Sequence, residues 1–156
     1  MRFVGTFDYA LDDRNRVPIP PAYRGAFEEG GYLATGTDRC LVIHTPDSFA
    51  RAAELIEAIP EETQEGEDAR RDFYGKVWPL QKDGQGRILI KEELLKFAGL
   101  VKEVKVVGVG RRLEVWDSAA YDARESDRQA ARIAAIKDLM RLTADNVQTG
   151  GVTWLS

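Results

Sequence analysis

Short stretches of alternating apolar and polar residues dominate this chain, and they predict β-strands more often than helices. Near the N-terminus, Phe3, Gly5, Phe7 and Tyr9 alternate with other side chains, and a short apolar run follows at 77–80. Further short apolar runs predict strands over 17–19, 32–35, 41–44, 88–90, 104–107 and 113–116. The pattern therefore indicates a mainly β protein.

Helical signals lie between and after these strands. Thr45 and Pro46 have the residue types of an N-cap and a first helical position, and Asp117 has the type of a second N-cap. Pro60 is expected to stop the first of these helices, and the second is expected to end near Leu142. Two brief helices are predicted over 21–27 and 91–98. The composite expectation is a mainly β chain with flanking helices.

The same order of elements occurs twice along the sequence. Residues 11–19 resemble residues 82–90, with an Asp, an Arg and an Ile repeated at a spacing of 71. With one inserted residue the match continues through the later strands and into the helices. The pairs are Asp12 and Asp83, Arg16 and Arg87, Ile19 and Ile90, Gly36 and Gly108, Arg39 and Arg111, Leu41 and Leu113, Ile43 and Val115, and Phe49 and Tyr121. Two copies of one unit are predicted.

The predicted repeats and helices divide the chain into five segments. We predict a first β repeat with the start of its helix at 5–51, and a helical, acidic linker at 52–76. A second β repeat follows at 77–120, a C-terminal helix at 121–142 and a flexible tail at 143–156.

Each repeat contains a tight turn between an aspartate and an arginine four residues later. Such a turn needs one residue with positive φ, for which Asn15 and Gly86 are suited. The side chains of Asp12 and Asp83 are expected to accept backbone N–H groups across the turns. We therefore assign these four residues to the structure of the turns.

The arginines of the turns admit two interpretations. They can form ion pairs that fix the turns, or they can offer positive charge to a polyanion. In the second case the residues presented are Arg14 and Arg16 in the first turn, and Lys82 and Arg87 in the second. Arginine suits this role because it binds phosphate and guanine edges through two parallel hydrogen bonds.

Several stretches together resemble the MraZ family of bacterial regulators, which are built from two SpoVT-AbrB repeats. The resemblance covers roughly residues 1–125 and rests on the segments 3–9 and 11–20 in the first half. In the second half it rests on 83–90, 97–100 and 107–116. This chain departs from the usual pattern with Asn15 at the turn glycine and Lys91 after the second short strand.

The resemblance implies a fold, an assembly and a partner. The fold is mainly β with flanking helices (α+β), made of two swapped-hairpin, double-psi β-barrel-type repeats, each followed by a helix. The assembly is a homo-oligomeric ring, and the partner is double-stranded DNA with repeated promoter sites. In the family the loop of the Asp-x-x-x-Arg motif faces DNA, which places Arg14 and Gln85 at the middle of the two loops.

Composition narrows the function further. The chain has 156 residues, a net charge of −4, one cysteine (Cys40) and one histidine (His44). These counts argue against a disulfide framework, a metal site or a Cys/His nucleophile, so no cofactor or metal is expected. Cys40 is expected to be a passive thiol, and His44 to lie at the surface or half-buried.

No apolar run approaches the ~20 residues that span a bilayer. We expect a cytoplasmic protein associated with the nucleoid, with no membrane and no small-molecule substrate.

The negative charge is concentrated in one part of the chain. Residues 25–72 hold twelve acidic and four basic side chains, whereas residues 73–116 hold nine basic and five acidic ones. The total therefore hides a mildly basic second β repeat, which is compatible with DNA binding.

The turns and the charge distribution favour a DNA-binding protein, and the family resemblance implies a sequence-specific double-stranded DNA-binding transcriptional regulator that acts on the promoter of the division and cell-wall gene cluster. The alternative is an AbrB-type antitoxin that binds DNA and a toxin partner. An enzyme is not expected, because no pair of carboxylates is placed for acid–base catalysis.

Overall fold

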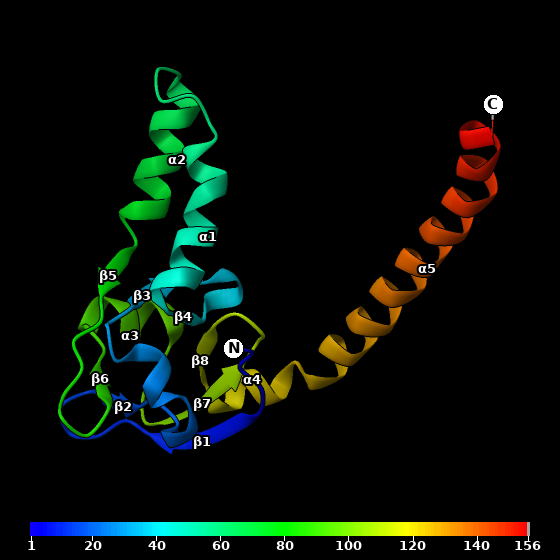
Figure 1. Cartoon of the computed structure of the whole chain (residues 1–156). Helices are drawn as coiled ribbons and strands as arrows, with labels where there is room; N and C mark the ends of the chain where they lie inside the picture. The colour runs from blue at the N-terminus through cyan, green and yellow to red at the C-terminus, as the bar shows by residue number, and fades with distance from the viewer. Residues whose placement is uncertain (156) are drawn as a thin grey trace. The chain divides into compact units, whose positions relative to one another are not determined.

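Figure 1 shows a computed structural model of the chain, which describes the backbone of residues 1–155 and the side chains of residues 1–147. The chain forms two compact units, Met1–Ala119 and Ala120–Ser156. The first unit contains every described strand, and the second is helical. The fold is α+β, with a mainly antiparallel sheet and several helices, in line with the predicted class.

One six-stranded sheet contains strands from both halves of the sequence. Its order is β1-β7-β8-β4-β3-β5, and all neighbours are antiparallel. The strands are β1 (Thr6–Ala10), β7 (Glu103–Gly108), β8 (Leu113–Asp117), β4 (Leu41–His44), β3 (Tyr32–Thr35) and β5 (Val77–Pro79). The predicted bounds of β3 and β4 are confirmed, and those of β7 and β8 differ by a single residue at their ends. The two halves are therefore joined through shared pairing.

A second, two-stranded sheet links the two predicted turns. It pairs β2 (Arg16–Pro18) with β6 (Arg87–Leu89), and Val17 lies opposite Ile88. Both of these apolar side chains are fully buried. Hydrogen bonds from Ile19 N to Gly86 O and from Ile90 N to Asn15 O continue the pairing into each turn. Segments far apart in sequence are thus held side by side.

A single apolar core joins the two sheets. Side chains from both halves of the sequence contribute to it, including Phe3, Val17, Ile19, Phe27, Leu41, Ile43, Ile88, Ile90, Leu94, Val104, Val106, Leu113 and Val115. The rings of Phe3 and Phe27 stack with centroids 5.7 Å apart. Removing this much apolar area from water is the main stabilising contribution to the first unit.

The helices of the first unit follow the predicted capping signals in part. They are η1 (Pro21–Phe27), η2 (Thr37–Arg39), α1 (Pro46–Glu57), α2 (Gln64–Tyr74) and α3 (Glu92–Ala98). The cap of α1 is confirmed, because Thr45 Oγ1 accepts a hydrogen bond from Ser48 N at 3.1 Å.

The acidic segment 52–76 is more ordered than its prediction as a linker suggested. It contains the separate helix α2, which lies beside α1 (Figure 1). The rings of Phe49 and Phe73 stack between these helices with centroids 5.6 Å apart. Thr63 caps α2 by accepting from Gly66 N. A helical linker is predicted here, and the segment contains the end of α1 and the separate helix α2.

The C-terminal helical segment begins at Ser118, next to the predicted cap Asp117, but it differs from its prediction in a break and in its length. The structure has two helices here, α4 (Ser118–Ala123) and α5 (Glu125–Leu155), rather than one helix ending at Leu142. Arg128 explains the break, since its Nη1 donates to Tyr121 O at 2.7 Å and its guanidinium lies 3.6 Å from the Tyr121 ring centroid.

The flexible tail predicted over 143–156 begins inside α5. Its side chains from 148 onward, including Trp154, lie outside the described residues. Over the part of the chain that is described, no helix combines the length and the apolar character needed to cross a membrane.

Candidate nucleic-acid interface

The first turn is organised by one carboxylate. Asp12 Oδ1 accepts hydrogen bonds from Arg14 N at 2.9 Å and Arg16 N at 2.8 Å. Its second oxygen, Oδ2, accepts from Arg16 Nε at 2.8 Å. Asn15 takes the left-handed conformation with φ 58°. The hydrogen bonds and the backbone of this turn are therefore those that the residue types of Asp12 and Asn15 favour.

The second turn has the same hydrogen bonds at the matching positions. Asp83 Oδ1 accepts from Gln85 N at 2.9 Å and Arg87 N at 3.0 Å, and Oδ2 accepts from Arg87 Nε at 2.8 Å. Gly86 takes the left-handed conformation with φ 75°. The two turns are therefore equivalent in backbone geometry.

Ion pairs also connect the turns to each other. Arg16 Nη1 lies 3.1 Å from Asp83 Oδ2, and Arg87 Nη1 lies 3.6 Å from Asp12 Oδ2. We refer to these four residues as the Asp–Arg cluster. Its charges alternate and cancel, and each arginine contacts the aspartate of both turns. The arginines therefore form ion pairs that fix the turns, as the first of the two interpretations predicts.

The cluster keeps both aspartates ionised. Desolvation acts to raise the pKa of Asp12, but the N–H groups of Arg16 and Arg14 and the Arg16 guanidinium together hold it below its ordinary value. The backbone N–H of Arg87, followed by that of Gln85 and the Arg87 guanidinium, lowers the pKa of Asp83 to about 2. The turns therefore keep their charges over the whole neutral range.

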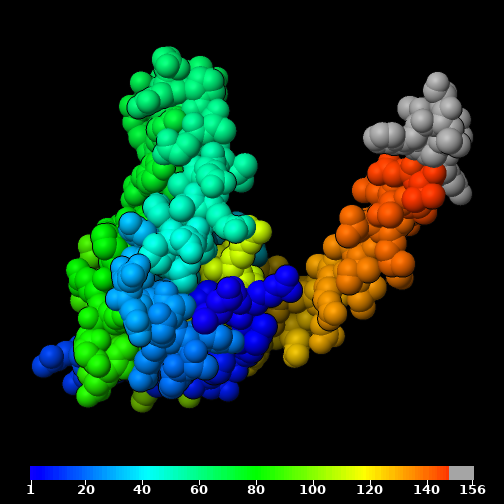
Figure 2. Space-filling view, viewed as in Figure 1, coloured from blue at the N-terminus to red at the C-terminus, as the bar shows by residue number. Residues whose placement is uncertain are grey.

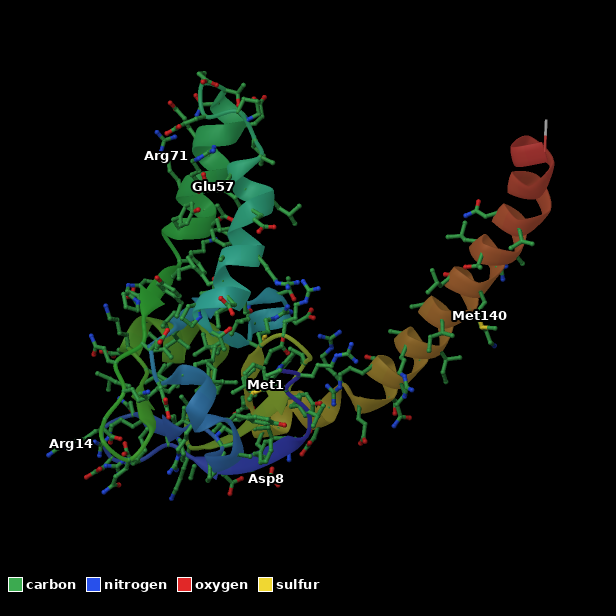
Figure 3. All side chains as sticks on the ribbon, in the orientation of Figure 1. Met1, Asp8, Arg14, Glu57, Arg71 and Met140 are labelled. Atoms are coloured by element: carbon green, nitrogen blue, oxygen red, sulfur yellow. The ribbon has the colours of Figure 1, made fainter. Side chains whose placement is uncertain are left out.

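The predicted DNA-contacting cations are placed differently from one another. Arg14 is exposed at the tip of the first turn and points away from the body of the protein (Figure 3). Among the described residues its side chain has no hydrogen-bond or ion-pair partner. Lys82 Nζ instead donates to Phe27 O at 2.6 Å, which ties it to η1.

Arg16 and Arg87 are partly exposed, and their guanidinium groups are bound within the Asp–Arg cluster. Their side chains are 20% and 31% exposed while they bind the aspartates. Figure 2 shows the early residues (blue) beside the second turn (green) at one end of this unit, with a few blue atoms projecting furthest. The geometry brings the two turns together. Arg14 and Lys82 are both exposed, but among the described residues Arg14 alone of the four predicted cations has no side-chain hydrogen-bond or ion-pair partner.

One cation near the turns was missed by sequence reasoning. Arg24 of η1 lies over the second turn, so closely that a Cβ atom at Gly86 would come within 2.6 Å of Arg24 Nε. The same Nε donates to Ile19 O at 3.4 Å. The Asp-x-x-x-Arg spacing does not point to Arg24, because this residue lies outside both turns. The need for glycine at position 86 is the only local signal of its approach.

The lone histidine and cysteine belong to the core. His44 is 9% exposed, and its Nδ1 lies 2.7 Å from Ser48 Oγ. Burial, followed by the charge of Arg112, lowers the pKa of His44 to about 4. The expectation of a surface or half-buried histidine is therefore wrong. Burial, followed by Glu114, raises the pKa of Cys40 to about 12, as suits a passive thiol.

No group of three His, Cys, Asp or Glu side chains within the described part of the chain could hold a metal ion. The two turns present hydrogen-bond donors and charged side chains. An arginine at a loop tip beside a rigid pair of turns can bind a phosphate or a base edge.

Comparison with known proteins points to one family. The family model described as "MraZ protein, putative antitoxin-like" matches residues 2–72 and 79–142. The match includes both turns, most of the six-stranded sheet and the first part of α5, and it stops before the end of that helix.

Three curated relatives carry the name "Transcriptional regulator MraZ". The protein from Kocuria rhizophila is 36% identical over 129 residues, which is 83% of this chain and 90% of the relative. The protein from Thermomicrobium roseum is 36% identical over 122 residues, covering 78% and 86%. The protein from Micrococcus luteus is 30% identical over 138 residues, covering 88% and 96%.

Proposed function

This chain belongs to the MraZ family, and from that premise we propose that it is a transcriptional regulator that binds double-stranded DNA sequence-specifically. The proposed target is the promoter of the division and cell-wall gene cluster. The protein would act in the cytoplasm, in association with the nucleoid. No catalytic step is part of this function.

The observation that carries the proposal is the pairing of the two turns. The Asp–Arg cluster and the β2–β6 pairing hold both loop tips on one rigid support. A support of this kind favours binding, because little conformational freedom is given up when the loops meet DNA. It also fixes the distance between two contacts, which is what a regular double helix requires.

Within this interface, Arg14 is proposed to make the principal contact with a phosphate or a guanine edge, because its guanidinium is exposed and uncommitted among the described residues. Arg16 and Arg87 would contribute through the part of each guanidinium that the cluster leaves exposed. Lys82 would contribute only if DNA displaces it from Phe27 O. Arg24 adds positive charge beside the second turn.

The fold and assembly implied by the family form the rest of the proposal. We interpret the two halves as SpoVT-AbrB repeats of the swapped-hairpin, double-psi β-barrel type, supported by the matching hydrogen bonds of the turns. We further propose a homo-oligomeric ring. One loop pair with little net charge is expected to bind weakly, and repetition around a ring would raise the affinity through effective concentration.

The experiment is a fluorescence anisotropy titration of the protein's own upstream DNA with Arg14→Ala at several salt concentrations. Removing one phosphate interaction per chain should weaken binding about tenfold and reduce the slope of log K against log salt by about 0.9 for each phosphate that is no longer neutralised. Lys96→Ala is the matched control, since Lys96 is an exposed cation of α3 that pairs with Glu92. Equal behaviour of both variants would refute the role of Arg14.

A second candidate is an AbrB-type antitoxin, favoured by the "antitoxin-like" wording of the family description. It would bind DNA with the same turns and a toxin with another surface. Co-expression with the products of neighbouring genes tests it: a growth defect relieved by this chain, with co-purification of the product, would support the antitoxin. A purely DNA-dependent phenotype would support the regulator alone.

A further inference from the structure

The helix α5 has an apolar surface that nothing in its own unit covers over the described residues. Six large apolar side chains of this helix are between 46% and 69% exposed, namely Ile133, Ile136, Leu139, Met140, Leu142 and Val147. A solvated helix of 31 residues gains little from exposing such side chains. An isolated helix is also only marginally stable in water, so a packing partner is favoured.

Four of these six side chains lie on one face of the helix, whereas Leu139 lies at its edge and Leu142 away from it. Ile133, Ile136, Met140 and Val147 recur at spacings of three, four and seven residues, which places them on one stripe, with Thr143 completing it. A shallow apolar groove of about 520 Å³ runs along this part of α5, lined by Leu139, Met140, Thr143, Ala144 and Val147. Met140 projects from the helix in Figure 3. The stripe has the spacing of a coiled-coil seam.

We propose that α5 packs along α5 of a second copy of this chain as an antiparallel pair. In the register proposed, Ile136 of one copy faces Val147 of the other, and Met140 faces Thr143. Ile136, Met140, Thr143 and Val147 of each copy then each face a side chain of the other helix. The seam is short, and an antiparallel pair has two-fold symmetry, so it would join chains of two rings rather than neighbours within one ring.

The charges beside the stripe select the antiparallel direction. Arg132 and Lys137 flank the stripe on its two sides, at the g and e positions of a heptad in which Met140 is an a residue. In a parallel pair, Arg132 of each copy would face Lys137 of the other, which places like charges together twice. In the antiparallel register, Lys137 lies beside Ala144 of the other copy, so this repulsion is absent.

The second half of the seam lies outside the matched family region. The family model ends at residue 142, whereas α5 continues to Leu155. Thr143, Ala144 and Val147 therefore belong to a part of the helix that the family match does not include. The pairing is inferred from this chain's own residues and does not depend on DNA binding.

Disulfide trapping in the full-length protein tests the proposal. Two differently tagged chains, one with Ile136→Cys and the other with Val147→Cys, are co-expressed and oxidised mildly. Both positions are exposed in the single chain, so neither change should prevent folding. The natural Cys40 is 1% exposed, and the unmodified chain gives the background. The antiparallel seam predicts a disulfide between the two different chains, at least tenfold above that background.

A matched control uses the opposite face at the same level along the pair. In the proposed register, position 138 of one copy lies level with position 145 of the other, as position 136 does with position 147. Asp138→Cys and Asp145→Cys therefore match the test pair along the axis, but these residues lie away from the stripe. They should give no disulfide above background. Capture of the control pair as strongly as the test pair would mean non-specific collision, and the proposal would be wrong.

The Ile136→Cys chain expressed alone decides the direction. Antiparallel packing separates the two copies of position 136 by about 16 Å along the axis, from a rise of about 1.5 Å per residue, so self-trapping is not expected. Strong self-trapping would establish a parallel pair and overturn the proposal. Absence of any trapping would overturn it as well, while leaving the DNA-binding proposal to its own titration.

Discussion

The two Asp-x-x-x-Arg turns share a backbone but differ at their tips. In each turn an aspartate accepts the N–H groups two and four residues later, and the arginine closes the turn onto the same carboxylate. At the tip, however, the first turn carries Arg14 and the second carries Gln85. The tip of the first turn can therefore neutralise a phosphate, whereas the tip of the second can form only uncharged hydrogen bonds.

The Asp–Arg cluster, which both turns share, builds the interface, whereas the differing tip residues are proposed to contact DNA. The Asp–Arg cluster uses its charges within the protein, and its net charge is zero. The residue at each tip is held through its backbone N–H, so its side chain is available for a ligand. A glutamine at such a tip suits an adenine edge, while an arginine suits guanine or phosphate.

The largest expected effect comes from weakening the β2–β6 pairing, which supports both turns. Ile88 is fully buried opposite Val17, so Ile88→Ala should cost about 2–5 kcal/mol of unfolding free energy. Leu89→Ala, on the same strand but 37% exposed, should cost less than about 1 kcal/mol. Urea denaturation at equal protein concentration measures both. Similar costs for the two variants would show that the β2–β6 pairing does not support the turns.

Between pH 7 and 5, a pH effect should come from only one of two matching strand positions. His44 and Trp116 occupy matching strand positions and are both buried, but only His44 titrates. Its pKa is lowered to about 4, so the folded protein holds it neutral while the unfolded chain binds a proton near pH 6.5. Stability therefore decreases as pH falls from about 6.5 toward 4, since the unfolded state then binds more protons.

Allowing for partial solvent screening, acidification from pH 7 to 5 should remove about 1–2 kcal/mol through His44. His44→Gln cannot titrate, so its thermal unfolding should depend less on pH over this interval. A pH dependence identical to that of the unmodified protein would contradict the assignment to His44.

A smaller effect should distinguish the left-handed residues of the two turns. Gly86→Ala should cost about 1–2 kcal/mol, because φ is 75° and the new Cβ would press on Arg24. Asn15→Gly should change stability by no more than about 0.5 kcal/mol, because asparagine already tolerates this conformation. Denaturant titration compares the two, and a larger cost at Asn15 would show that its side chain has a role beyond the turn.

The parts predictable from sequence were those fixed by local chemistry. The positive φ of Asn15 and Gly86, the aspartate hydrogen bonds and the Thr45 cap each follow from residue types a few positions apart. Strand positions followed from alternation, since each strand buries apolar side chains in the common core.

The remainder depends on tertiary contacts. Spacing alone gave no register between β2 and β6, and it did not bring Arg16 to Asp83 or Lys82 to Phe27 O. Helix α2 packs on α1 through Phe73 and Phe49, a contact that the prediction of a helical linker did not include. The length of α5 could not be inferred from a tail with paired glycines, which normally disfavour helix.

The most direct test of the central claim exchanges the two tips. Arg14→Gln and Gln85→Arg are each titrated with the upstream DNA over a range of salt concentrations. If Arg14 makes the ionic contact and both tips reach the DNA, Arg14→Gln should reduce the salt slope by about 0.9 for each phosphate involved, and Gln85→Arg should increase it by about as much. A slope that neither exchange alters would contradict the assignment of the two turns as the DNA-binding surface.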